Sequence, residues 1–464
     1  MLRFGTDGIR GRANDELSPE LALGLGRAAA RVLAGPEGGR RLFLVGRDTR
    51  RSGPMLQAAL AAGLLAEGVD VADLGVMPTP AVAAASAAHG VPAAMISASH
   101  NPYWDNGIKF FLPGGKKLPD QTEEDLEAEL SLLVSGDEVL AAGNGVTGRV
   151  GASVEVGAHT AMPEALGAYI AQVVASLDGR SLRGLKVVLD CANGAACTTA
   201  ASVFGRAGAD VVEVIGASPD GTNINDECGS THPQALSSAV VARGADLGLA
   251  FDGDADRVIA VTGAGEIVDG DRLLALFATD LAQRGELARS TVVVTVMSNI
   301  GFHRAMAGAG ISVHTVSVGD RYVLEALDAN GWSLGGEQSG HIVFRSLATT
   351  GDGVLSGLLL ADLVVRRGRS LAELSSAAME KFPQVLRNVT VADRHGLAGA
   401  AHVWAQVRRL EEQLAGKGRI VLRPSGTEPL VRVMVEAPTA GEAEHAADLL
   451  VGALHEALGP GTVH

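Results

Sequence analysis

Residues 247–257 read LGLAFDGDADR, an apolar run that ends in three alternating aspartates. The run 247–251 has the length and composition of a buried strand, and Asp252, Asp254 and Asp256 follow it in a loop that contains glycine. In open α/β sheets, ligands bind beyond the carboxyl ends of the strands. This stretch therefore predicts an α/β domain with a polar site at the end of one of its strands.

The order of elements around this stretch occurs three times along the chain. Each copy alternates strands with helices and ends its third strand in a polar, glycine-containing loop, which is typical of βαβ units and of sheets covered on both faces. We expect strands at 42–45, 69–74, 93–96, 186–190, 209–214, 247–251, 291–296, 312–316 and 332–334, and helices at 54–67, 80–89, 195–207, 232–243, 301–309 and 321–329.

The last part of the chain has a different pattern. Strands are expected at 382–391, 419–422 and 431–436, with helices at 401–414 and 440–458, which indicates a smaller α+β domain. A chain of 464 residues is also too long for a single hydrophobic core. The predicted fold is α/β: three similar α/β/α domains with mixed sheets and a C-terminal α+β domain around a central cleft. Their predicted ranges are 1–150, 151–255, 256–370 and 371–464.

Composition excludes several classes of protein. Acidic residues outnumber basic ones by 53 to 38, and no basic stripe is present, so a general nucleic-acid-binding protein is not expected. No apolar stretch approaches the 18 residues that a membrane helix needs, and the first residues lack the pattern of a signal peptide. The chain has three cysteines, Cys191, Cys197 and Cys228, and their spacing is not that of a disulfide framework. This favours a reducing compartment and no structural disulfides. We therefore expect a cytoplasmic protein.

Ser99 lies in the loop SASHNP that follows the predicted strand 93–96. A serine becomes a nucleophile only when a base, a metal or a bound phosphate changes its surroundings. Lys109, ten residues later, could neutralise a phosphoryl group on Ser99 or carry a proton. The alternative is a serine that merely caps a turn.

The aspartate loop is the strongest chemical signal in the sequence. Three convergent carboxylates repel one another unless a hard cation such as Mg²⁺ or Ca²⁺ lies between them. Arg257 adds an anion-binding group directly after Asp256. The alternative is a solvated acidic turn, but the apolar residues on both sides disfavour it.

Two further loops carry groups that suit a phosphorylated sugar. Glu337, Gln338, Ser339 and His341 offer hydrogen bonds of both senses to a polyol or an amino sugar. A second set combines guanidinium, hydroxyl and glycine, as in a phosphate-binding loop, without the spacing of a Walker motif: Arg423, Ser425, Gly426, Thr427 and Arg432. Each loop could also be a plain surface turn. Together with the other two loops, they predict phosphoryl transfer on a phosphosugar.

These motifs, in this order, resemble the α-D-phosphohexomutase superfamily. The resemblance covers nearly the whole chain and rests on residues 5–11 (GTDGIRG), 97–102, 252–257, 336–341 and 423–429. Residues 223–232, Gln338 and residues 318–322 are similar to the branch that acts on glucosamine phosphate, and the branches for mannose or glucose phosphate are the alternative. Ala255 departs from the glycine that is common in the family, so the metal loop is expected to differ slightly in flexibility.

The resemblance implies a four-domain isomerase with a phosphoserine at Ser99. Mg²⁺ would be held by Asp252, Asp254, Asp256 and an oxygen of the Ser99 phosphate. Glucosamine 6-phosphate would become glucosamine 1-phosphate through a bisphosphorylated sugar, and the same bisphosphate would act as activator. The product would supply UDP-N-acetylglucosamine for bacterial cell-wall precursors.

The resemblance also implies a role for each candidate residue. Arg10, Lys109 and Arg257 would neutralise phosphoryl charge, and Lys109 or His341 would transfer the proton. Glu337 and Ser339 would hold sugar hydroxyls. The anchor for the phosphate that does not react would be Arg423, Ser425, Gly426, Thr427 and Arg432.

Two other functions remain open at this point: a regulatory relative that has lost turnover, and a metal-dependent phosphatase. The expected partner is a phosphosugar, with neither nucleic acid nor a membrane, and a homodimer is left open.

Overall fold

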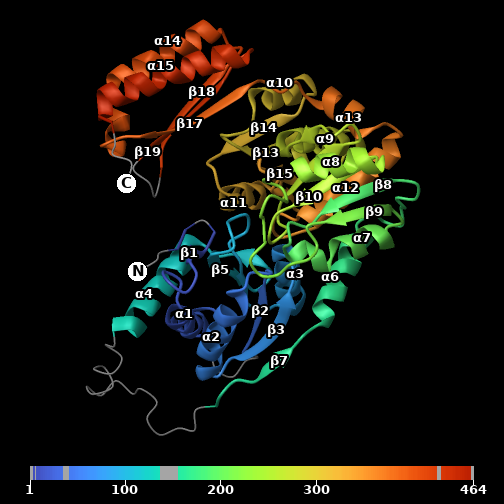
Figure 1. Cartoon of the computed structure of the whole chain (residues 1–464). Coiled ribbons are helices and arrows are strands. Elements are labelled where there is room, and N and C mark those ends of the chain that lie inside the picture. The colour runs from blue at the N-terminus through green and yellow to red at the C-terminus, as the bar shows by residue number, and fades with distance from the viewer. Residues whose placement is uncertain (1–3, 6, 35–40, 136–154, 426–429, 461–464) are drawn as a thin grey trace.

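The computed structural model describes the chain except for residues 1–3, 6, 35–40, 136–154, 426–429 and 461–464, and four sheets form its frame (Figure 1). Three sheets are mixed and carry helices, and the fourth is a three-stranded antiparallel sheet. The predicted fold class, three α/β units followed by an α+β unit, is confirmed. Among the described residues, no helix has the length and apolar character to cross a membrane.

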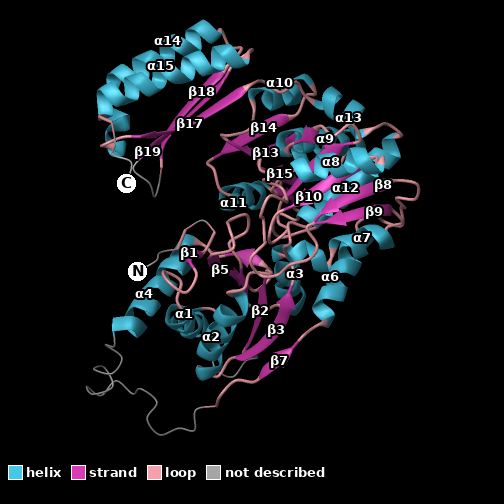
Figure 2. Ribbon diagram, viewed as in Figure 1, coloured by secondary structure: helices cyan, strands magenta, loops and turns pink. Residues whose placement is uncertain are grey.

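The first sheet has the order β1-β5-β4-β2-β3-β7, with β6 beside β5. Figure 2 shows α1 and α2 on one side of β2 and β3, and α3 on the other. The elements are β1 (Ile9–Arg12), α1 (Pro19–Val32), β2 (Leu42–Arg47), α2 (Gly53–Ala66), β3 (Asp70–Val76), α3 (Thr79–His89), β4 (Ala93–Ile96), β5 (Asp105–Leu112), β6 (Lys116–Lys117), α4 (Asp120–Ser135) and β7 (His159–Ala161).

The second sheet has the order β12-β11-β10-β8-β9. Its parallel strands β9, β8 and β10 are followed by antiparallel β11, so the aspartate loop connects two neighbouring antiparallel strands. The elements are α6 (Glu164–Ala175), β8 (Lys186–Asp190), a 3₁₀ turn (Ala195–Thr198), α7 (Ala200–Arg206), β9 (Asp210–Ile215), α8 (Gln234–Arg243), β10 (Leu247–Phe251), β11 (Val258–Thr262) and β12 (Ile267–Val268).

The third sheet has the order β14-β13-β15-β16, and the fourth β17-β19-β18. Two helices, α14 and α15, cover one face of the fourth sheet (Figure 1). The third unit contains α9 (Gly270–Arg284), β13 (Thr291–Thr295), α10 (Ile300–Gly308), β14 (Ser312–Val316), α11 (Asp320–Asn330), β15 (Leu334–Gly336), β16 (Ile342–Phe344), α12 (Gly353–Arg367) and α13 (Leu371–Ala378); the fourth contains β17 (Gln384–Thr390), α14 (Ala401–Leu414), β18 (Arg419–Pro424), β19 (Leu430–Glu436) and α15 (Ala440–Leu458).

The sheets extend past two of the expected domain boundaries. Strand β7 pairs with β3 of the first sheet, although it follows residue 150. Strands β11 and β12 continue the second sheet beyond residue 255. Strands β7 and β12 lie at the edges of their sheets, and β11 lies between β10 and β12. All three add to a finished βαβ pattern, so the repeat on which the predicted boundaries rest does not include them.

Two expected elements also differ in detail. The helix expected at 195–207 is a 3₁₀ turn followed by α7, because the amide of Ala195 donates to the carbonyl of Gly253 in the aspartate loop and holds the first turn there. The strand expected at 332–334 begins at Leu334, because Gly331 ends α11 in the left-handed conformation and Trp332 still bonds back to Leu327.

Candidate active site

Ser99 lies in the loop between β4 and β5, at the carboxyl end of β4. Its backbone is left-handed, with φ of 51°, and its side chain is buried. A left-handed conformation is unfavourable for a residue with a Cβ, so the surrounding structure must enforce it. The hydroxyl Oγ donates to Oδ2 of Asp252 at 2.7 Å, which joins the first expected loop to the second.

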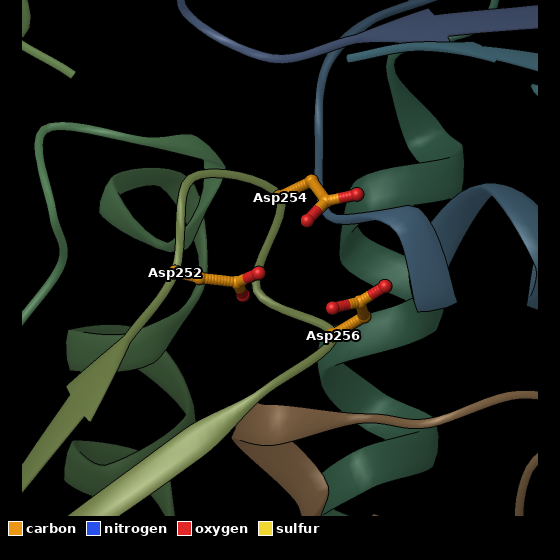
Figure 3. A group of neighbouring side chains, drawn as sticks. All are labelled: Asp252, Asp254 and Asp256. Atoms are coloured by element: carbon orange, nitrogen blue, oxygen red, sulfur yellow. The ribbon is translucent and has the colours of Figure 1, made fainter. Parts of the chain in front are cut away.

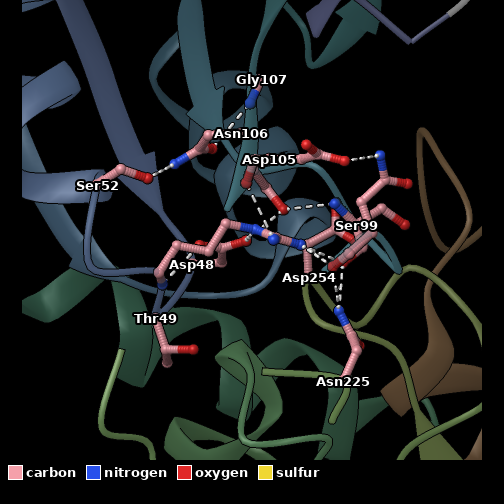
Figure 4. A network of polar contacts seen from close by, with 12 residues as sticks. Asp48, Thr49, Ser52, Ser99, Asp105, Asn106, Gly107, Asn225 and Asp254 are labelled. Atoms are coloured by element: carbon pink, nitrogen blue, oxygen red, sulfur yellow. Dashed lines mark hydrogen bonds and ion pairs between the residues drawn. The ribbon is translucent and has the colours of Figure 1, made fainter. Parts of the chain in front are cut away.

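A buried network fixes the backbone of this loop (Figure 4). The amide of Ser99 donates to Oγ of Ser97 at 2.9 Å, and that hydroxyl donates to Oδ2 of Asp48 at 2.7 Å. Asp48 also accepts from Nε of Arg50 at 2.8 Å, and Nη2 of Arg50 donates to the carbonyl of Ser99 at 2.8 Å. Ser99 is therefore held at both its N–H and its C=O.

Asp252, Asp254 and Asp256 converge in the loop between β10 and β11 (Figure 3). All three are buried, and one carboxylate oxygen of each lies within 4.8 Å of the others. Burial, together with repulsion from Asp256 and Asp254, raises the pKa of Asp252. Burial acts in the same direction on Asp256, but the charges of Lys109, His341 and Arg257 outweigh it and lower the pKa of Asp256 to about 2.

The triad fits a hard divalent cation such as Mg²⁺. Oδ2 of Asp254 accepts from Oγ1 of Thr79 at 2.6 Å, whereas Oδ1 of Asp254 and Oδ1 of Asp256 are buried and accept no hydrogen bond from the described residues. Buried carboxylate oxygens without donors are costly unless a cation takes them as ligands.

Cationic side chains surround the triad. Nζ of Lys109, on β5, lies 3.7 Å from Asp256, and Nε of Arg257 lies 3.8 Å from Asp256 and 4.0 Å from Asp252. Burial lowers the pKa of Lys109, but the attraction of Asp256, Asp254 and Asp7 prevails and raises it, so this side chain stays charged.

Arg10 approaches from β1. It lies opposite Gly107 of β5 and pairs with Asp7 at 3.5 Å. A Cβ on Gly107 would lie 2.9 Å from Cγ of Arg10, so glycine at this position leaves room for the arginine. The structure thus places Arg10 on the strand next to the one that carries Lys109.

The loop expected to bind a sugar, residues 337–341, follows β15 and returns into β16. Oε1 of Glu337 accepts from the amide of Gly319 at 3.1 Å, and Oε2 accepts from Oγ of Ser339 at 3.1 Å. The amide of Val258, at the start of β11, donates to the carbonyl of Gly340 at 3.1 Å. The third expected loop is therefore attached directly to the aspartate loop.

His341 is buried beside this junction. Its Nε2 lies 3.7 Å from Asp320, and neither ring nitrogen has a hydrogen-bond partner among the described residues. A Cβ on Gly351 would lie 2.3 Å from Nε2, so the ring needs a glycine beside it. An imidazole in this position can exchange a proton with a bound substrate.

Of the residues expected to bind a phosphate, Arg423 lies on β18 and Arg432 on β19, at paired positions of the two strands. Burial and the like charge of Arg432 lower the pKa of Arg423, while Glu337 raises it. The amide of Ser425 donates to the carbonyl of Leu430 at 2.9 Å. Gly426 and Thr427 lie outside the described residues.

Asp48, Arg50 and Thr79 also contact the site residues, but the sequence patterns did not predict them. Asp48 and Arg50 follow β2, the strand next to β4, so the rule that polar sites lie at the carboxyl ends of strands could have found them. The predicted loops all follow the third strand of a repeat, whereas β2 is a first strand. Thr79 begins α3 and carried no comparable signal.

Family models match all four parts of the chain. Residues 1–132, 167–265 and 269–382 match the models "Phosphoglucomutase/phosphomannomutase, alpha/beta/alpha" domains I, II and III, and residues 386–453 match the C-terminal domain of the same family. The expected resemblance is confirmed.

Curated relatives match over nearly the full length. A phosphoglucosamine mutase of Desulforudis audaxviator is 53% identical, over 94% of this chain and 93% of the relative. Another, of Rhodococcus jostii, is 52% identical, over 97% and 98%.

Solved structures share the fold. A phosphoglucomutase/phosphomannomutase family protein of Burkholderia thailandensis has a TM-score of 0.76 at 26% identity, with 97% of each chain covered. The N-acetylphosphoglucosamine mutase of Aspergillus fumigatus, solved with GlcNAc-6P and magnesium, has a TM-score of 0.68 at 18% identity, over 98% of this chain and 96% of the other.

Proposed function

The chain belongs to the phosphoglucomutase/phosphomannomutase family and is an isomerase with the activity of a phosphoglucosamine mutase, and we propose that Ser99 carries the phosphoryl group in this reaction. The observation that supports this role is the contact of 2.7 Å between Oγ of Ser99 and Oδ2 of Asp252. It brings a buried serine hydroxyl to the edge of three convergent carboxylates. A phosphoserine there would share its charge with a metal bound by the triad.

The reaction runs in two transfers. In the first, the bond between phosphorus and Oγ of Ser99 breaks as a bond forms to O1 of glucosamine 6-phosphate. His341 accepts the hydroxyl proton, because Lys109 is already protonated, and Oγ of Ser99 takes up a proton as it leaves. The resulting bisphosphate turns over in the cleft. In the second, Ser99 takes the phosphoryl group from O6, the sugar oxygen regains a proton, and glucosamine 1-phosphate leaves.

Charge neutralisation supports both transfers. Mg²⁺, held by Asp252, Asp254, Asp256 and an oxygen of the Ser99 phosphate, would supply a Lewis acid at the reacting phosphoryl group. Arg10, Lys109 and Arg257 are placed to share the negative charge that builds up on its oxygens, and Lys109 and Arg257 already lie within 4.0 Å of the triad.

The sugar and its second phosphate are held by the other two loops. Glu337 and Ser339 bind sugar hydroxyls or the amino group. Arg423 and Arg432, together with Ser425, Gly426 and Thr427, bind the phosphate that is not reacting. The two arginines lie side by side on paired strands, so they present two guanidinium groups to one anion.

Three further points complete the proposal. A glucosamine or glucose 1,6-bisphosphate starts the cycle by loading Ser99. The protein acts in the cytoplasm, where its product supplies UDP-N-acetylglucosamine synthesis. A homodimer remains a prediction.

The test is a coupled mutase assay with Mg²⁺ and catalytic bisphosphate that compares the 6-phosphates of glucosamine, glucose and mannose. A preference of several hundredfold in kcat/KM for the amino sugar, roughly 3–4 kcal/mol of transition-state discrimination, is expected. Comparable rates on glucose or mannose phosphate would move the chain to another branch of the family. Release of inorganic phosphate in place of isomerisation would indicate a phosphatase.

A further inference from the structure

Two side chains from different domains donate to the same pair of carbonyls in the Ser99 loop (Figure 4). Nη2 of Arg50 lies 2.8 Å from the carbonyl oxygens of both Ser99 and Asn101. Nδ2 of Asn225 lies 2.9 Å from the Ser99 oxygen and 3.0 Å from the Asn101 oxygen. Arg50 follows β2 of the first sheet, whereas Asn225 lies between β9 and α8 of the second.

These bonds use the full capacity of the groups involved. A carbonyl oxygen has two lone pairs, and a terminal nitrogen of Arg or Asn has two hydrogens. The oxygens of Ser99 and Asn101 each accept one hydrogen from Arg50 and one from Asn225. Neither peptide group can rotate without losing bonds to both domains.

Asn225 also lies against the aspartate loop. Its backbone N–H donates to the carbonyl of Ala192 at 2.9 Å, and this bond holds Asn225 within the second domain. Its backbone is left-handed, with φ of 58°. A Cβ on Gly253, between Asp252 and Asp254, would lie 3.0 Å from Nδ2 of Asn225 and 2.5 Å from the carbonyl oxygen of Ser99. The Ser99 loop, Asn225 and the aspartate loop therefore meet at one glycine.

We propose that Asn225 is a positioning residue that ties the Ser99 loop of the first domain to the second domain, so that Oγ of Ser99 keeps its distance from the aspartate loop during phosphoryl transfer. This inference rests on the proposed role of Ser99. Phosphoryl transfer depends on accurate placement of the reacting atoms, and a displacement of about 1 Å can cost on the order of 100-fold in rate. Arg50 fixes the loop within its own domain; Asn225 fixes it relative to the carboxylates.

The variants are Asn225→Gly and Asn225→Asp, with Asn193→Gly as the matched control. Glycine adopts the left-handed backbone conformation without strain and lacks the side-chain amide. Asn193 also has positive φ, 49°, but its side chain bonds to the amide of Ser218 and the carbonyl of Asn223, both in the second domain. Aspartate has the shape of asparagine, but it has no hydrogen to donate and repels the two carbonyl oxygens.

We expect Asn225→Gly to lower kcat by roughly 10- to 100-fold with KM within about threefold of the wild type, and Asn225→Asp to lower it further. Asn193→Gly should retain wild-type kcat. Equal kcat in Asn225→Gly and Asn193→Gly would overturn the proposal. If Asn225→Gly does not fold, the isosteric Asn225→Asp takes its place in the same comparison.

A second readout does not depend on turnover. Calorimetry with Mg²⁺ alone compares protein whose Ser99 has been phosphorylated by glucose 1,6-bisphosphate, checked by mass spectrometry, with dephosphorylated protein. In the wild type and in Asn193→Gly, phosphorylation of Ser99 should increase the affinity for Mg²⁺. In Asn225→Gly this increase in affinity should be at least several-fold smaller. An undiminished gain in Asn225→Gly contradicts the role of Asn225, whereas no gain in the wild type contradicts the proposed function itself.

Discussion

The three α/β domains and the C-terminal domain are held together in different ways. One hydrophobic cluster runs from Leu42 in the first domain through Leu189 in the second and Val292 in the third, and it ends at Met379. The C-terminal domain has a cluster of its own, built from residues between Val385 and Leu458. The first three domains therefore share apolar packing that ends at Met379, and the described residues from Val385 onward form a separate cluster.

The contacts between the third and fourth domains that the structure describes include several polar ones. Nη2 of Arg419 donates to the carbonyl of Ser298 at 2.7 Å, and the amide of Ile300 donates to Glu436 at 2.9 Å. Polar contacts of this kind can exchange with water, whereas separating a shared core exposes apolar surface. The difference fits the proposed mechanism, in which the intermediate turns over while the proposed phosphate anchor lies on a separate, mobile domain.

Ser99→Ala tests the first side of this comparison, the three α/β domains, and should have the largest effect. It removes the hydroxyl that contacts Asp252, so mutase turnover should fall by at least about 1,000-fold, because the proposed phosphoryl carrier is lost. The coupled assay with glucosamine 6-phosphate and bisphosphate measures it. Near-normal turnover would exclude the phosphoserine mechanism. If circular dichroism shows that Ser99→Ala does not fold, Ser99→Gly takes its place, because glycine adopts the left-handed conformation without strain and also lacks the hydroxyl.

Asp254→Asn tests whether the triad is built for a cation. Mg²⁺ affinity should fall by roughly 10-fold or more, and kcat/KM by roughly 100- to 1,000-fold. Without Mg²⁺ the variant should melt at or above the wild-type temperature, because one of three mutually repelling buried carboxylates is gone while Thr79 can still donate to residue 254.

Melting curves recorded with Mg²⁺ and with a chelator check both expectations, the weaker binding of Mg²⁺ and the unchanged or higher melting temperature without it. The wild type should gain stability from Mg²⁺, by about 2.7 kcal/mol at a concentration of 100 times Kd, and the variant should gain less. If the melting temperature of the wild type is the same with and without Mg²⁺, the triad does not bind the ion.

The part of the site that the sequence predicted is the part where a motif follows a strand directly. Ser99, Asp252 and Glu337 each follow a third strand of the repeat, and the structure brings their loops into contact. Asn225 and Thr79 were not predicted as site residues, because each reaches the site through a long-range bond that spans more than 100 residues. Local periodicity carries no signal for such a pair.

The fold was predictable for a related reason. Buried strands such as β8 and β10 have the expected bounds, because continuous apolar runs mark them. The edge strands β7 and β12 were not predicted, since short edge strands have little apolar pattern: His159–Ala161 is exposed throughout. Their register depends on neighbours that are distant in sequence.

Arg423→Met tests the other side of the comparison, the C-terminal domain. KM for glucosamine 6-phosphate should rise by roughly 10- to 100-fold while kcat changes less, because the arginine is proposed to bind the phosphate that does not react. The melting temperature without substrate should stay the same or rise, since burial and the like charge of Arg432 disfavour the charged form of Arg423. A large fall in kcat at constant KM would instead place Arg423 at the reacting phosphoryl group.

Arg304→Met should have the smallest effect. The guanidinium of Arg304 lies 4.7 Å from the ring centre of Phe382, at the junction between the third and fourth domains. A cation–π contact of this kind contributes about 0.5–1 kcal/mol, and methionine keeps much of the packing. The exposed hydrogen bond from Nη2 of Arg304 to the carbonyl of Gly416, 2.6 Å long, adds about 0.5–1.5 kcal/mol. Differential scanning calorimetry should show a small downward shift in the transition of the C-terminal domain, with no change in the transition of the other three. An equal shift of a single transition would mean that the four domains unfold as one unit.

The separate cluster of the C-terminal domain also bears on how the protein is made. A ribosome releases the chain from its N-terminus, and domains generally fold as they emerge. Every residue of the cluster that spans the first three domains precedes Val385, so that core can close before the last domain has left the ribosome. The growing chain therefore completes the serine and aspartate loops first, and gains its arginine pair only at the end of synthesis.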